Sequence, residues 1–114
     1  MGTIIANYGE LVSLSMVRGD TFDIVVEFER DAITLASAYF TIKRVASESA
    51  IIAQKTLSNG ISKTDDNEYT VTLEPSDTST LTAGTYDFDF QASADGETLT
   101  PVLGKLNIIQ DVTF

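Results

Sequence analysis

Apolar side chains recur at every second position in six stretches of this chain. The clearest, residues 22–28, reads FDIVVEF, with Phe22, Ile24, Val26 and Phe28 separated by two acids and a valine. A period of two predicts half-buried antiparallel strands, each with one face in the core and the other in solvent. The six stretches are residues 12–17, 22–29, 38–43, 69–74, 85–92 and 105–108.

Turn signals separate these stretches. Asn59-Gly60 is a strong turn signal. Asp95-Gly96 is a hairpin signal and predicts a further strand that starts near Thr98. Residues 18–20, 29–31 and 64–67 are further expected turns, and residues 50–57 (AIIAQKTL) form one more expected short strand. About seven short strands at this spacing indicate an all-β fold, an immunoglobulin-like antiparallel β-sandwich.

The segment from residue 75 to 81 (PSDTSTL) breaks the alternation. It is too polar for a strand, so we expect one short helical turn near residues 76–81, capped by Ser76 or Asp77, with Leu81 closing the end of the core. Tyr86 follows, at the start of the aromatic strand. It is expected either to form a tyrosine corner, in which its hydroxyl bonds an upstream backbone group, or to be an ordinary core tyrosine.

The chain of 114 residues is long enough for one domain with a single core. We expect residues 1–10 to be an N-terminal arm or a leading strand and residues 11–114 to be the β-sandwich. We find no apolar run long enough to span a membrane, no signal peptide and no cysteine, which fits synthesis in a reducing cytoplasm.

The negative charge is concentrated in one part of the chain. Residues 65–104 carry nine acids and no base, and so hold nearly all of the net charge of −10. A field of this sign repels phosphates, so we expect neither nucleic acid nor membrane as a partner. The acidic segment 65–104 is either a solvated β face or a patch for a basic partner.

The sequence contains neither histidine nor cysteine, which removes the common nucleophile systems and the usual zinc ligands. Two pairs of acids, Asp87 with Asp89 and Glu27 with Glu29, each lie two apart on a strand, about 6.5–7 Å, within the range of inverting glycosidases. Alternating acids on a solvated face are a far commoner cause of this pattern. We therefore expect no catalytic residues, no cofactor and no enzyme activity.

The loop at residues 65–68 (DDNE) has oxygen ligands for calcium, but it lacks the spacing of a calcium-binding loop. We expect no metal site. Arg18-Gly19-Asp20 matches the integrin-binding tripeptide, yet glycine and aspartate at this position are also typical of a tight turn. We expect a turn between two strands.

Four motifs follow one another along residues 16–113. They are Gly19-Asp20-Thr21, the run 76–90 (SDTSTLTAGTYDFDF), the run 95–106 (DGETLTPVLGKL) and the ending 108–113 (IIQDVT). In this order they resemble the N-terminal domain of the phage baseplate upper protein family, whose members continue past this ending into stalk or receptor-binding regions. This sequence stops at Phe114, so the resemblance implies either a stand-alone virion protein or one domain of a longer protein.

The resemblance implies a non-enzymatic phage or prophage structural protein, a tail or baseplate component located in the virion after synthesis in the bacterial host cytoplasm. Its expected partners are other virion proteins, and it is expected to be a homo-oligomer. The alternative is an Ig-like ligand-binding, carbohydrate-binding or adhesion module. Candidate contact surfaces are residues 4–8, residues 112–114, and the side chains of Tyr39 and Val25, which we expect to face outward.

Overall fold

The computed structural model describes residues 2–5, 11–28, 32–45, 50–94, 96–99 and 102–110. Within these residues the chain forms ten strands and one helical turn. The strands are β1 (Gly2–Ile5), β2 (Leu11–Val17), β3 (Phe22–Glu27), β4 (Ser37–Lys43), β5 (Ala53–Leu57), β6 (Gly60–Asp65), β7 (Glu68–Leu73), β8 (Gly84–Ala94), β9 (Glu97–Thr98) and β10 (Val102–Ile109), and the helical turn is α1 (Pro75–Thr78).

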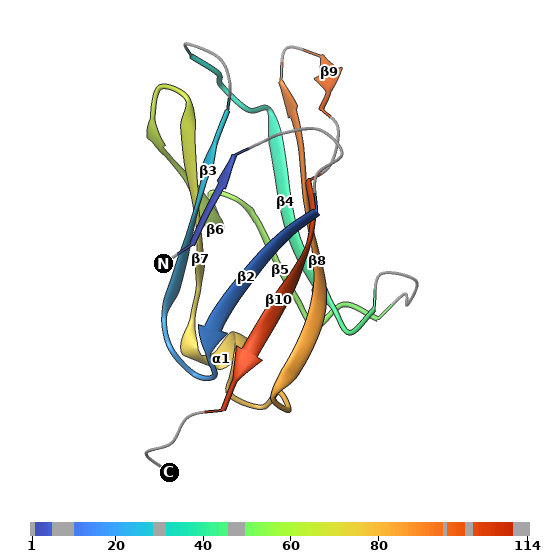
Figure 1. The fold of residues 1–114 in the computed structure, drawn as a ribbon. Coiled ribbons are helices and arrows are strands. Elements are labelled where there is room, and N and C mark those ends of the chain that lie inside the picture. Colours follow the sequence, from blue (N-terminus) through green and yellow to red (C-terminus); the bar gives the residue numbers. More distant parts are fainter. Residues whose placement is uncertain are drawn as a thin grey trace.

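The strands follow one hydrogen-bonded path in the order β1-β3-β7-β6-β5-β4-β8-β10-β2, with β9 attached to β8. The path folds back on itself, so that β3 and β7 lie on one side of the molecule and β4, β8 and β10 on the other (Figure 1). Short parallel pairing of β5 with β6 joins the two halves. The predicted all-β, immunoglobulin-like sandwich is confirmed.

All six alternating stretches form strands, namely β2, β3, β4, β7, β8 and β10. Ten strands are present in the described residues, however, where the sequence predicted about seven. β6 was missed because only Ile61 among its six residues is buried, which leaves no alternation to detect. β1 is the leading strand that was one of two options for the N-terminus, and it pairs in parallel with β3.

The core fills the space between the two halves. Phe40 on β4 and Phe88 on β8 stack with their ring centroids 5.2 Å apart. Phe28 meets Tyr69 edge-on at 6.2 Å, and the Tyr69 hydroxyl accepts a hydrogen bond from the backbone N–H of Leu35 at 2.8 Å. This bond satisfies the one polar atom of a side chain that is otherwise buried among apolar groups.

The expectation that Val25 is an exposed contact residue is wrong, although its position on β3 faces outward. Val25 is 8% exposed, and its neighbours Ile24 and Val26 are fully buried. β3 lies between β1 and β7, with Val25 directly across from Thr3 on one side and Thr70 on the other. Flanking strands on both sides shield even its outward-facing position.

The helical turn is shorter than expected, and its cap lies elsewhere. The N-cap is Glu74, not Ser76 or Asp77, and Asp77 acts from the third position by accepting the Glu74 N–H at 2.7 Å. Leu81 packs against the core but remains half-buried. The fully buried residue of this segment is Thr78.

The tyrosine corner is present. The Tyr86 hydroxyl, at the start of β8, donates to the backbone carbonyl of Thr82 at 2.6 Å. This bond fixes the entry of the chain into β8, which pairs with both β4 and β10 in the middle of its sheet.

Candidate interaction surfaces

The Arg18-Gly19-Asp20 tripeptide forms the turn between β2 and β3, as expected. Gly19 has a φ of 81°, and the N–H of Asp20 donates to the Val17 carbonyl at 3.2 Å. α1 contacts the turn directly, because the Gly19 N–H donates to Thr78 Oγ1 at 2.9 Å. The Arg18 guanidinium donates to the Leu81 carbonyl at 3.3 Å, so the arginine lies against the protein rather than projecting as an adhesion loop would require.

The two acids of β8 lie on the outer face of its sheet. Asp87 forms an ion pair with Lys105 on the neighbouring β10. Asp89 accepts a hydrogen bond from the side-chain amide of Gln91 at 3.1 Å. Both carboxylates therefore take part in surface contacts of the kind that solvated sheets carry. Of the other pair, Glu27 is exposed and Glu29 lies outside the described residues.

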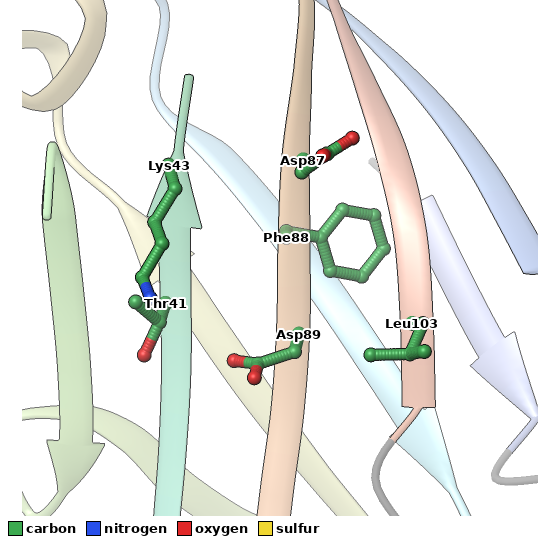
Figure 2. Close-up of a pocket in the computed structure, with 6 residues that line it drawn as sticks. All are labelled: Thr41, Lys43, Asp87, Phe88, Asp89 and Leu103. Carbon is green, nitrogen blue, oxygen red and sulfur yellow. The ribbon is translucent and has the colours of Figure 1, made fainter. Parts of the chain in front are cut away.

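A shallow depression of about 60 Å³ lies over this face, between β4, β8 and β10. Figure 2 shows the Asp89 carboxylate pointing toward Thr41 and Lys43, while Asp87 points away from them. The depression is small beside the roughly 300–1,000 Å³ of pockets that enclose a small molecule. It is lined by Thr41, Lys43, Asp87, Phe88, Asp89 and Leu103.

The loop considered for calcium is a tight turn between β6 and β7. Asp65 Oδ1 accepts the N–H of Asp66 at 2.8 Å, and the Asn67 side chain donates to the Phe28 carbonyl at 3.2 Å. Glu68 accepts the Thr64 hydroxyl at 3.0 Å. These contacts serve the turn itself, and no group of three metal-ligating side chains lies together in the described part of the chain.

Some described acids of segment 65–104 are paired with bases from outside it. Asp87 meets Lys105, and Asp77 meets Lys55 on β5 with 2.9 Å between Nζ and Oδ2. Other acids of the segment, such as Asp65, Asp66 and Glu74, are exposed. The segment is thus partly neutralised within the molecule, and its other described acids lie both on strands, such as Asp89 on β8 and Glu68 on β7, and on turn residues such as Asp66.

Exposed apolar side chains gather on the sheet formed by β4, β8, β10 and β2. Tyr39 is 44% exposed, which confirms that it faces outward. Ile109 on β10 lies directly across from Val17 on β2, and both are exposed. The sequence reasoning missed Ile109 and Leu103. The sequence could have indicated both, because they occupy the positions of β10 that alternate with the inward-facing Leu106 and Ile108.

The two candidate terminal surfaces are only partly described. Residues 4 and 5 belong to β1, whose backbone runs beside β3. Residues 6–8 and 112–114 lie outside the described residues.

The site geometry and strand order define an immunoglobulin-like β-sandwich domain, and the solved structures agree. No family model matches the chain, and no curated protein matches its sequence. CopC from Methylosinus trichosporium OB3b is 14% identical, with a TM-score of 0.56 over 90% of this chain and 88% of that one. The N-terminal domain of phage TP901-1 ORF48 is 8% identical, with a TM-score of 0.54 over 96% of this chain and 95% of that domain.

An endo-β-1,4-mannanase from Thermotoga petrophila is 11% identical, with a TM-score of 0.53. The match spans 87% of this chain and 18% of that enzyme. At these identities the comparisons show a shared fold, which includes the fold of a phage protein domain. No helix among the described residues has the length and apolar character to cross a membrane.

Proposed function

We propose that this chain is a non-enzymatic structural protein of a phage or prophage particle, a tail or baseplate component. It acts by oligomerising and by docking to other virion proteins, and it is located in the virion after synthesis in the bacterial host cytoplasm. The observation that carries the proposal is the match to the phage TP901-1 ORF48 domain, which spans 96% of this chain and 95% of that domain. The order of motifs over residues 16–113 points to the same class independently.

The chemistry of the surface supports a role without catalysis. Asp87 is paired with Lys105, and Asp89 accepts a hydrogen bond from Gln91, so both carboxylates lie in contacts on the outer face of the sheet. A rigid sandwich offers instead edge strands and exposed apolar side chains, such as Tyr39 and Leu103, as contact points. Repetition of such modest contacts by symmetry yields stable particles.

The test is the protein's presence in particles. Phage or induced prophage particles from the encoding genome are purified on a density gradient, and their proteins are identified by peptide mass spectrometry. We expect this chain to migrate with tail proteins at a fixed ratio to them, and gold-labelled antibody to mark the tail or its tip. The proposal is overturned if intact tailed particles lack the chain and it is recovered only in the soluble lysate.

The alternative, an Ig-like ligand-binding or carbohydrate-binding module, has one feature in its favour, the exposed ring of Tyr39. This ring lines a second, open depression of about 310 Å³ with residues 36–38, Thr56 and Leu57. Stacking on a sugar would need such a ring. A glycan array distinguishes the two proposals, because a virion connector is expected to show no saturable sugar binding that depends on Tyr39.

A further inference from the structure

The turn between β5 and β6 places an asparagine directly before a glycine. Both residues, Asn59 and Gly60, are exposed. The side-chain amide of an asparagine can be attacked by the backbone nitrogen of the next residue, and a glycine at that position leaves the approach free of a side chain. The described part of the chain holds two other asparagines, Asn67 and Asn107, and the three differ in how firmly their amides are held.

The side-chain amides of Asn67 and Asn107 are held by hydrogen bonds. Asn67 Nδ2 donates to the Phe28 carbonyl at 3.2 Å. Asn107 Oδ1 accepts the Thr85 hydroxyl at 2.7 Å. Both asparagines are half-buried, and each is followed by a residue with a large side chain. The Asn59 side chain, in contrast, is exposed and has no hydrogen bond to any residue that the structure describes.

The backbone bonds that close this turn do not use the N–H of Gly60. Thr56 and Asn59 exchange two bonds, one in each direction, at 3.0 and 2.9 Å. The Ser58 N–H donates to the Ile61 carbonyl at 2.9 Å. Gly60 is the first residue of β6, so any ladder bond of its N–H lies at a strand end, where local opening costs little free energy.

We propose that Asn59 is a site of spontaneous covalent modification, in which its side-chain amide is lost and water completes the reaction. The Gly60 nitrogen gives up its proton and attacks Cγ of Asn59. A C–N bond forms, the bond from Cγ to Nδ2 breaks, and the amide group leaves with that proton as ammonia. The resulting succinimide ring is opened by water at either of its carbonyls, which yields aspartate or isoaspartate. Water is the co-reactant, and no atom is oxidised or reduced.

The two products have different effects on the turn. Aspartate keeps the backbone and adds one negative charge, whereas isoaspartate inserts a methylene group into the backbone between residues 59 and 60. The bonds between Thr56 and Asn59, and the short pairing of β5 with β6, depend on the native spacing. Gly60 is also tightly packed, since a Cβ there would lie 2.6 Å from Cδ of Lys55. Isoaspartate is therefore expected to loosen the pairing that joins the two halves of the sandwich.

The first experiment compares the three asparagines within one sample of the isolated chain, so it does not depend on the proposed function. Cleavage by trypsin after Lys55, Lys63 and Lys105 puts each asparagine in a peptide of its own. The folded chain is incubated at mildly alkaline pH, digested and analysed by mass spectrometry. Exchange of an amide for a carboxylate raises the peptide mass by about 1 Da.

We expect the peptide of residues 56–63 to gain this mass several-fold faster than the peptides of residues 64–105 and 106–114. Asn59→Gln is the matched control, because glutamine would have to form a larger ring, and its peptide is expected to keep its mass over the same period. The proposal is overturned if residues 56–63 of the wild-type chain gain mass no faster than the other two peptides, or if the glutamine variant gains it at the wild-type rate.

The second experiment tests the effect on the turn. Asn59→Asp reproduces the aspartate product and is expected to unfold at the same urea concentration as the fresh wild-type chain. Incubated wild-type chain that contains isoaspartate, separated by chromatography, is expected to unfold at a lower urea concentration than either. If the isoaspartate form unfolds together with Asn59→Asp, the lengthened backbone does not loosen the turn, and this part of the proposal is wrong.

Discussion

The Nζ atom of Lys55 on β5 lies 2.9 Å from Oδ2 of Asp77 in α1, and both side chains are only 16% exposed. The same carboxylate oxygen accepts the N–H of Glu74, the N-cap of α1, at 2.7 Å. The Lys55 stem passes over Gly60, where a Cβ would lie 2.6 Å from Cδ of the lysine. Asp77 therefore both closes the helical turn and attaches it to the sheet.

Removing Asp77 is expected to destabilise the protein more than removing the charge of Lys55. Asp77→Ala loses the capping bond, at about 0.5–2 kcal/mol, together with the ion pair. Lys55→Met keeps the stem over Gly60 and loses only the ion pair, about 1 kcal/mol or less. Urea unfolding of both variants and of the double variant measures the coupling. An equal cost for the two single variants would show that the cap contributes nothing.

Gly104 on β10 is expected to tolerate no side chain. A Cβ there would lie 2.4 Å from the Phe88 ring and 2.5 Å from the Val12 carbonyl oxygen, which belongs to the backbone and cannot turn aside. Gly104→Ala should lower the free energy of unfolding by about 1–3 kcal/mol or more, as overpacking does. Denaturant unfolding of the variant and the wild-type chain measures this loss of stability.

Gly19→Ala is the matched control, because the space around Gly19 is open and only its φ of 81° opposes a side chain. We expect a smaller loss there, about 1 kcal/mol. If Gly104→Ala lowers the free energy of unfolding less than Gly19→Ala does, the result contradicts the close packing of the Phe88 ring against Gly104.

Thr78 is expected to hold the Arg18-Gly19-Asp20 turn through one atom. It is fully buried, and its Oγ1 accepts the Gly19 N–H at 2.9 Å. Thr78→Val has nearly the same shape and leaves that N–H without its partner, at a cost of about 1–3 kcal/mol. Thr78→Ser retains the acceptor and should be less harmful. Hydrogen exchange at Gly19 should speed up in the valine variant only, and unchanged exchange there would contradict the bond.

The tyrosine corner is expected to contribute modestly to stability. Tyr86→Phe loses the 2.6 Å bond to the Thr82 carbonyl, which should cost about 0.5–1.5 kcal/mol. Tyr39→Phe, on the exposed face, should stay within about 0.5 kcal/mol of wild type. Thermal unfolding compares the two variants, and equal effects would mean that the corner bond has no net value.

Much of the fold could be predicted because burial on one face of a strand leaves a period of two in the sequence. The stretch around Ile24 and Val26 shows it, and so does the turn chemistry of Gly19 and Asn59-Gly60. β6 escaped prediction because its single buried residue, Ile61, makes no pattern. Val25 was misplaced because alternation assigns a face but says nothing of the strands on either side.

The candidate surfaces depended more on the tertiary structure. The interpretation of Arg18-Gly19-Asp20 as a turn came from the sequence, but the contact between Gly19 and Thr78 spans 59 residues and could not. The ion pairs of Asp77 and Asp87 likewise join residues from separate strands or turns. Such contacts depend on strand order and register, which local patterns leave open.

By itself, the sequence determined the class of fold and the position of six strands, because these follow from local periodicity and turn chemistry. For Tyr86 it left two alternatives, and the bond to the Thr82 carbonyl in the structure decided for the tyrosine corner. Only the tertiary structure decided which strands became edges. The order of the strands places β1 and β2 at the two ends of the path, and β2 pairs with β10 alone along that path. A strand lies at an edge when one of its sides has no hydrogen-bonded strand, and which strands pair depends on packing between residues far apart in the sequence.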